Sequence, residues 1–306
     1  MNKEKILNIL GEEKVRFDEP LKNHTSFKIG GPADVLVSVS NADELIKTIE
    51  YAKEENIEFF LLGNGSNVLA SDKGYRGMVI KLDGEFNDGK VLGDTIKAGA
   101  GITLSKLAGL AMNSSLSGLE FASGIPGTLG GALFMNAGAY GGEMKQVVTK
   151  VSVLDLTRQP KDETSIKELS NEEMDFGYRH SILKEKDYIA LGCEMKLNPG
   201  DKEAIASYMR ELASKRKEKQ PLEFPSAGST FKRPEGYFAG KLIEDANLGG
   251  FSIGGAEVSN KHKGFVINKG SATAKDVKDL IDYVIKTVKE QSGVTLEPEV
   301  LFLGEF

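Results

Sequence analysis

Two glycine-rich segments carry the residue types that bind anions through the backbone. The first, residues 63–67, reads GNGSN, and the second, residues 123–131, reads SGIPGTLGG. Glycines reach positive φ values and let backbone N–H groups approach a phosphate closely, and successive N–H groups in such turns form anion-binding concavities. Because few basic residues lie nearby, a pyrophosphate would be held here mainly by backbone dipoles, with side-chain donors from Ser66, Asn67, Ser123 and Thr128.

Neither segment matches a standard nucleotide-binding fingerprint. The spacing is not G-x-G-x-x-G after a strand, and no G-K-[ST] follows, which disfavours a Rossmann nicotinamide domain and a P-loop hydrolase. Taken singly, each segment is equally well explained by tight turns. Together with residues 136–141 (NAGAYG) they favour a bound dinucleotide. The candidate ligands are Gly63, Asn64, Gly65, Ser66, Asn67, Ser123, Gly124, Ile125, Pro126, Gly127, Thr128, Gly130, Gly131, Asn136, Gly138 and Tyr140.

The remaining reactive side chains and the charge balance exclude several classes of function. His24, His180 and His262 are widely separated in the chain, so we expect no metal site. Cys193 is the single cysteine and lies in an apolar run typical of a buried strand, which indicates a core thiol. A net charge of −6 argues against a nucleic-acid partner or an anionic membrane surface. With no apolar run that could cross a bilayer, we expect a cytoplasmic protein, and nothing in the sequence requires an oligomer.

The elements that must position the first glycine segment can be read from the apolar spacing. Residues 34–39 and 57–62 are predicted strands, and residues 45–52 show the spacing of a helix between them. Asn41 and Glu44 fit a capping box at the start of that helix. A strand, a helix and a strand in this order predict a right-handed parallel crossover.

Later segments continue the mixture of helices and strands. Residues 118–142 have little periodicity, and a stretch of that length is predicted to be a functional loop. Thr273 and Gly293 are predicted to begin and end one strongly amphipathic helix. The predicted elements are strands at 147–154, 188–193 and 294–303, and helices at 201–219 and around 277–288.

Seven segments, in order over nearly the whole chain, identify a family. Through these segments the chain resembles the UDP-N-acetylenolpyruvoylglucosamine reductases. It is similar to the shorter subclass of that family, which lacks an inserted loop that carries a tyrosine. Arg233 stands where some members carry asparagine, so the UDP contacts are where this chain departs from the family. The segments are 23–33 (NHTSFKIGGPA), 63–67, 124–142, 176–181 (FGYRHS), 225–234 (PSAGSTFKRP), 239–244 (AGKLIE) and 296–300 (LEPEV).

The resemblance implies a fold and a reaction. The expected fold is α+β, with a two-domain FAD-binding fold of the vanillyl-alcohol-oxidase type and a C-terminal α/β domain for a UDP-sugar. Residues 1–82 and 83–200 would form the FAD-binding subdomains and 201–298 the substrate domain, with the last strand, 299–306, a candidate to return to the first subdomain. The implied reaction uses non-covalent FAD and NADPH to reduce UDP-N-acetylglucosamine enolpyruvate to UDP-N-acetylmuramate for peptidoglycan.

The same resemblance places Arg179, Ser229 and Glu299 at the chemistry. Reduction of an enol ether conjugated to a carboxylate builds negative charge beside that carboxylate, and one carbon must then be protonated. Arg179 would bind the carboxylate in a bidentate fork, and Ser229 would donate the proton. Glu299 helps only if it is protonated or offset by a cation, so it is expected to orient the charged cluster. Without the resemblance, each of the three fits an ordinary surface or turn residue.

Substrate binding is expected from Lys232, Arg233, Arg216 and Glu244. Lys232 carries a fixed positive charge three residues after Ser229 and suits a phosphate or carboxylate, while Arg216 suits the diphosphate. Two alternatives stay open at this point, because a fold does not fix its chemistry. One is another FAD oxidoreductase of the same fold, and the other is a non-catalytic protein that binds flavin or a UDP-sugar.

Overall fold

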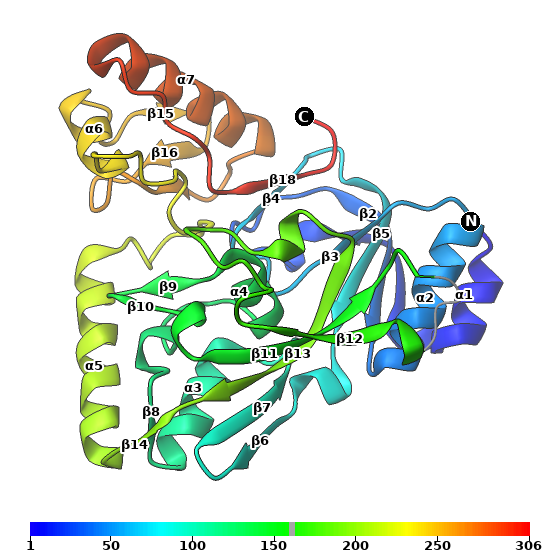
Figure 1. Cartoon of the computed structure of the whole chain (residues 1–306). Helices are drawn as coiled ribbons and strands as arrows, with labels where there is room; N and C mark the ends of the chain where they lie inside the picture. The colour runs from blue at the N-terminus through cyan, green and yellow to red at the C-terminus, as the bar shows by residue number, and fades with distance from the viewer. Residues whose placement is uncertain (159–162) are drawn as a thin grey trace. The chain divides into compact units, whose positions relative to one another are not determined.

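The structure is a computed structural model that describes residues 1–158 and 163–306 (Figure 1). Helices and sheets are mixed, which confirms the α+β class expected from the sequence. Among the described residues, no helix combines the length and the apolar composition that a membrane crossing requires. The chain forms two compact units: unit 1 is Met1–Arg16, Leu36–Gly63 and Met78–Arg216, and unit 2 is Phe17–Val35, Asn64–Gly77 and Lys217–Phe306.

Unit 1 is built around an antiparallel five-stranded sheet with the strand order β12-β11-β13-β7-β6 (Figure 1). Cys193 is buried in β13 and packs in the same core as apolar residues of β11 and of helix α3, as the sequence predicts. The elements are β6 (Gly89–Leu92), β7 (Thr95–Gly99), α3 (Leu104–Asn113), β8 (Leu116–Ser117), β11 (Val148–Asp155), β12 (Ile166–Ser170), β13 (Tyr188–Lys196), β14 (Asn198–Pro199) and α5 (Lys202–Lys219).

A second sheet has the order β1-β2-β5-β3, and β3 runs parallel to β5. The predicted helix is α2, and Asn41 caps it by accepting a hydrogen bond from the Glu44 N–H at 2.9 Å. The Ser40 N–H, one residue before Asn41, donates to the Glu44 carboxylate at 2.8 Å, so the reciprocal bond of the predicted capping box comes from Ser40 and not from Asn41. Because β5 lies between β2 and β3, the two strands that flank α2 are not neighbours in the sheet, and the right-handed parallel crossover stays a prediction. The elements are α1 (Lys3–Leu10), β1 (Val15–Pro20), β2 (Pro32–Val39), α2 (Ala42–Glu54), β3 (Phe59–Leu61) and β5 (Tyr75–Leu82).

The stretch predicted as one long loop, 118–142, contains a helix, α4 (Leu129–Met135), and a small hairpin of β9 (Gly138–Ala139) and β10 (Gly142–Glu143). The helix escaped prediction because Gly130 and Gly131 occupy its first turn, where glycine lowers helix propensity. Its formation rests on the Thr128 side chain, which caps the helix, and on burial of Leu129 and Leu133. Tertiary packing therefore overrides local propensity at this point.

Unit 2 has its own core between helices and a three-stranded antiparallel sheet, β15-β16-β17. Helix α7 begins after Thr273, which forms a capping box with Asp276, and ends at Gly293 with φ 75°, as predicted. The last strand, β18, pairs in parallel with β4 and is shorter than the predicted 294–303. The elements are β4 (Val68–Ala70), α6 (Ala239–Asp245), β15 (Ser252–Ile253), β16 (Ala256–Val258), β17 (Val266–Asn268), α7 (Ala274–Ser292) and β18 (Leu301–Leu303).

Asp155, at the end of β11, is a buried carboxylate on which the acid stability of unit 1 depends. Its burial disfavours ionisation, but hydrogen bonds from Thr157 (2.6 Å to the hydroxyl oxygen) and Lys167 (3.0 Å) outweigh that cost and lower its pKa to about 2. Because the pKa is lower in the folded state than in the unfolded state, the ionised Asp155 stabilises the fold above about pH 4. This stabilisation is lost as the pH falls toward about 2 and the carboxylate becomes protonated. Asp155→Asn should therefore cost about 2 kcal/mol at pH 7 by chemical denaturation, a cost that shrinks below about pH 4. The exposed Asp187→Asn is the matched control and should cost little at either pH.

Candidate functional site

Gly63, the first residue of the first glycine-rich segment, lies beside the second segment in unit 1, whereas residues 64–67 belong to unit 2. A Cβ atom added to Gly63 would lie 2.5 Å from the Thr128 hydroxyl, so the end of the first segment touches the second. Thr128 and Thr103, which cap the starts of α4 and α3, form an antiparallel bridge, and the Gly130 N–H donates to the Ala100 carbonyl at 2.7 Å. Residues 99–103 (GAGIT) therefore belong to the same cradle. The sequence analysis missed them, although two glycines between a strand and a threonine cap were a usable signal.

Several backbone N–H groups of these segments have no acceptor in the part of the chain that the structure describes. In the first segment they belong to Gly63, Gly65, Ser66 and Asn67; in the second, to Gly124, Gly127 and Thr128. Gly65 is itself buried, and a buried N–H without a partner is rare in proteins. Such a set of unpaired donors fits the phosphates of a dinucleotide.

A cation lies beside the second segment. The Arg216 guanidinium packs over Gly124, since a Cβ there would lie 3.3 Å from its nitrogen. Burial lowers the pKa of Arg216, and the nearby Tyr140 acts in the opposite direction. No carboxylate among residues 1–158 and 163–306 forms an ion pair with Arg216, so its charge is available to an anion. Three predicted site residues, Gly124, Tyr140 and Arg216, are thus brought together in unit 1.

The Asn136 side chain, predicted to bind the cofactor, forms its hydrogen bonds with other groups of the protein. Its side chain is 2% exposed and its amide donates to the Glu143 carboxylate (3.1 Å) and to the Gly177 carbonyl (3.0 Å). Its carbonyl oxygen accepts from the Lys145 N–H at 2.9 Å. Because all these groups are engaged, Asn136 positions the turn that follows Gly177. Ser123 is likewise engaged locally, donating to the Glu120 carbonyl at 2.8 Å.

Arg179 sits on a strained two-residue turn in unit 1. Gly177 and His180 exchange both backbone hydrogen bonds, at 3.1 and 3.2 Å, so Tyr178 and Arg179 form the turn between them. Arg179 has φ 54°, a left-handed value that is uncommon for a residue other than glycine. Glycine would be the residue of lowest cost at this position. Its guanidinium lies 5.1 Å from the centre of the exposed Tyr178 ring.

Ser229 and Glu299 are brought together in unit 2. Phe231 bridges Pro298, and the Glu299 N–H donates to the Thr230 carbonyl at 2.8 Å, so the two candidate segments run side by side. The Glu299 carbonyl in turn accepts from the Asn67 side chain at 3.1 Å, which ties in the first glycine segment. The Ser229 hydroxyl makes no hydrogen bond to any residue that the structure describes.

The space beside Ser229 is open. The preceding Gly228 has φ 74°, and no described heavy atom lies within 4 Å of the Cβ that another residue would place there. Thr230, on the other side, is buried and its hydroxyl accepts from the Val266 N–H at 2.9 Å. The serine is therefore held between a fixed threonine and an open glycine, which suits a hydroxyl that must reach a ligand.

The predicted substrate-binding residues of unit 2 all have protein partners. Lys232 forms an exposed ion pair with Glu297 at 3.0 Å, and its N–H donates to the Glu297 carbonyl. Arg233 stacks on the Phe238 ring at 4.1 Å. Glu244, on α6, pairs with Lys263 (3.3 Å) and Lys241 (3.5 Å), and the hydrogen bond from Lys263 is the main cause of its lowered pKa. Such exposed pairs are weak enough to exchange for a ligand.

The geometry of the first glycine segment predicts a large effect of one methyl group. Gly65 has φ 61°, and a Cβ there would overlap the His24 carbonyl oxygen. We expect Gly65→Ala to yield protein without the flavin that the sequence implies, measured by visible absorbance after purification. Gly93→Ala is the matched control, since Gly93 also has a positive φ of 64° but has nothing within 4 Å. It should cost about 1–2 kcal/mol and keep the flavin. Equal flavin loss in both variants would contradict this role of Gly65.

Comparison with known proteins adds a family and a cofactor domain. The model of an FAD binding domain matches residues 33–157, which confirms the expected FAD-binding fold, and that of the UDP-N-acetylenolpyruvoylglucosamine reductase C-terminal domain matches residues 220–303. A UDP-N-acetylenolpyruvoylglucosamine reductase from Caldanaerobacter subterraneus subsp. tengcongensis is 57% identical, over 99% of this chain and 98% of its own. A UDP-N-acetylenolpyruvoylglucosamine reductase from Clostridioides difficile is 52% identical, over 98% of this chain and 97% of its own. The crystal structure of the reductase from Thermus caldophilus superimposes with a TM-score of 0.80 at 36% identity, covering 95% of this chain and 98% of that chain.

Proposed function

Because the chain belongs to the UDP-N-acetylenolpyruvoylglucosamine reductase family, we propose that it reduces UDP-N-acetylglucosamine enolpyruvate to UDP-N-acetylmuramate, with bound FAD and with NADPH as reductant. The observation that carries the proposal is that the chain matches these reductases over 99% of its length and bears unpaired backbone N–H groups on each of its two glycine segments. The product is a precursor of peptidoglycan.

The cradle in unit 1 would hold the FAD diphosphate. Its donors in unit 1 would be the N–H groups of Gly63, Gly124, Gly127 and Thr128, and Arg216 supplies a charge beside Gly124. FAD, when bound, supplies hydride taken from NADPH to the vinyl carbon of the substrate. The chain's own task is then to bind the carboxylate, to stabilise the growing charge and to deliver a proton.

We assign these tasks to Arg179, Ser229 and Glu299. Arg179 binds the substrate carboxylate through its planar fork and lowers the energy of the enolate as charge grows. Ser229, whose hydroxyl has no described partner and which follows the open position of Gly228, protonates the carbon next to the carboxylate. A weak acid suffices, because that carbanion is a much stronger base than an alkoxide. Glu299 orients the charged cluster from the segment that pairs with Thr230.

Lys232 and Arg233 would bind the phosphates or the carboxylate of the UDP-sugar. Both lie in the segment just after Ser229, and Lys232 can exchange its exposed ion pair with Glu297 for a substrate anion. We further propose that the protein works in the cytoplasm as a monomer, without a membrane or nucleic-acid partner. The net charge of −6 and the single, buried thiol of Cys193 support this proposal.

An anaerobic titration tests the proposed function against its alternatives. The purified protein should be yellow, NADPH should bleach it, and UDP-N-acetylglucosamine enolpyruvate should restore the colour rapidly. UDP-N-acetylglucosamine, which lacks the enolpyruvyl group, is the matched control and should not restore it. Rapid reoxidation by oxygen alone would favour an oxidase, and a flavin that NADPH cannot bleach would favour a binding protein.

A further inference from the structure

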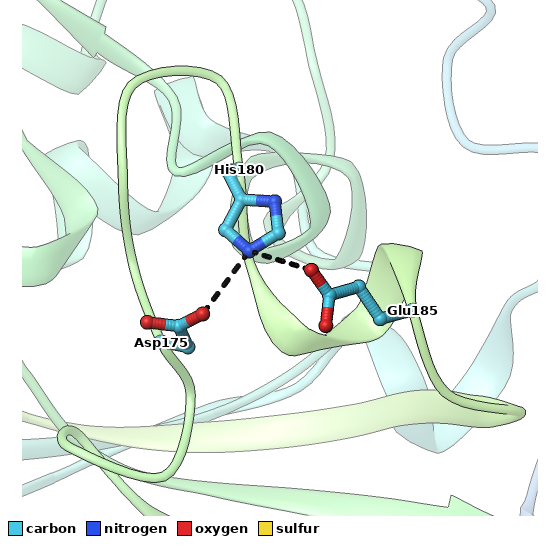
Figure 2. A group of neighbouring side chains, drawn as sticks. All are labelled: Asp175, His180 and Glu185. Atoms are coloured by element: carbon cyan, nitrogen blue, oxygen red, sulfur yellow. Dashed lines mark hydrogen bonds and ion pairs between the residues drawn. The ribbon is translucent and has the colours of Figure 1, made fainter.

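One histidine of unit 1 lies between two carboxylates. Figure 2 shows the His180 ring with its Nε2 atom facing both Asp175 and Glu185. The Nε2 atom is 3.3 Å from the Asp175 oxygen and 3.6 Å from the Glu185 oxygen, and the three potential ligand atoms all lie within 4.8 Å of one another. The sequence suggested no metal site because the histidines are scattered, but the fold gathers carboxylates around one of them instead.

The backbone holds these three positions firmly. His180 exchanges two hydrogen bonds with Gly177, the Ile182 N–H donates to the Met174 carbonyl at 2.8 Å, and the Glu185 N–H donates to the Ile182 carbonyl at 3.1 Å. The neighbouring apolar side chains Met174, Phe176 and Leu183 are buried in the core. The Asp175 and Glu185 side chains are exposed and His180 is partly exposed, so an ion can reach all three from solvent.

The spacing of the three atoms suits a metal ion better than a pair of salt bridges. A charge-assisted N–H···O bond has a length of about 2.7–2.9 Å, and both contacts of His180 are longer. A metal ion bonded at about 2.1 Å to each ligand keeps neighbouring ligand atoms about 3.0–3.4 Å apart, which is close to the two observed separations. The Asp175 and Glu185 side chains are exposed, so their oxygens can adjust around an ion.

We propose that Asp175, His180 and Glu185 bind one divalent transition-metal ion of the zinc class and thereby clamp the turn that carries Arg179. One imidazole and two carboxylates are ligands that such ions accept, and the remaining positions would hold water. Because Asp175 and His180 flank the Tyr178–Arg179 turn, an ion that joins them closes a short ring around it. The ion would hold Arg179 in its strained conformation. The proposal goes beyond the reductase activity, and its binding test does not depend on turnover.

Zinc binding to the full-length, untagged and chelator-treated protein tests the site by isothermal titration calorimetry. The wild type should bind one zinc ion with a micromolar dissociation constant. Asp175→Asn and Glu185→Gln should each weaken binding about tenfold or more, and His180→Gln should remove it.

Two control variants separate this site from general surface binding. Glu172→Gln removes a nearby exposed carboxylate, and His24→Gln removes a histidine that faces Glu19 at 2.8 Å. Both should bind zinc as the wild type does. Wild-type binding weaker than about 0.1 mM, or unchanged binding by His180→Gln or by the double variant D175N/E185Q, would overturn the site. Failure here leaves flavin binding and bleaching by NADPH untouched, so it is distinguishable from failure of the proposed function.

Hydrogen exchange tests the clamp. The amides of Gly177 and His180 donate to each other's carbonyls, so their exchange reports opening of the turn. Saturating zinc should slow exchange at both amides in the wild type and in Glu172→Gln, and should change nothing in D175N/E185Q. Zinc binding without slower exchange would refute the clamp.

Discussion

Arg179→Ala should lower turnover by about 10²–10³-fold while the protein stays yellow, because Arg179 is proposed to act on the substrate carboxylate and not on the flavin. NADPH should still bleach the flavin at the wild-type rate. The loss should appear when reduced protein is mixed with the enolpyruvyl substrate in a stopped-flow spectrometer, as slow return of the colour. An equal slowing of bleaching by NADPH would contradict this assignment.

The backbone of Arg179 offers a matched control. With φ 54°, this position favours glycine, so Arg179→Gly removes the guanidinium and also relieves the turn. We expect Arg179→Gly to be as inactive as Arg179→Ala but more stable than it by about 1 kcal/mol in chemical denaturation. Arg179→Lys keeps the charge without the planar fork and should recover only part of the activity. Full activity in Arg179→Lys would show that only charge matters.

Ser229→Ala should lower turnover by about 10²–10⁴-fold through loss of the proton donor. The loss should again fall on oxidation of the reduced protein by substrate, and flavin content and bleaching by NADPH should stay unchanged. The surroundings favour this reading, because Thr230 is fixed by its bond to Val266 while the Ser229 hydroxyl has no described partner.

Two further variants sharpen the Ser229 test. Ser229→Cys keeps a proton donor of similar size and should recover activity above Ser229→Ala. Ser226→Ala changes the serine three residues before Ser229. The backbone carbonyl of Ser226 accepts a hydrogen bond from the Ser26 hydroxyl at 2.6 Å, and the substitution keeps that carbonyl. It should leave turnover within about a factor of two of the wild type, since truncations away from special contacts cost little. Equal activity of Ser229→Ala and Ser226→Ala would remove Ser229 from the chemistry.

Local chemistry in the sequence determined the elements whose signals act within one turn. Asn41 and Thr273 cap α2 and α7 because a side-chain oxygen reaches an N–H only three residues away, and Gly293 ends α7 because it accepts a left-handed φ. The apolar run around Cys193 indicated a buried strand for the same kind of local reason. The glycine segments could also be found, since glycine is the residue that most readily accepts a positive φ, as at Gly65 with 61°.

Only the tertiary structure decided which of these segments meet. Asn67 reaches Glu299 across 232 positions, Gly63 touches Thr128, and α4 forms in spite of two glycines in its first turn. The carboxylates around His180 come together because a tight turn and a short helix are fixed by buried neighbours. Packing of two cores sets these long-range pairings, and no local propensity encodes them, because a propensity describes one residue's backbone and not its distant partner.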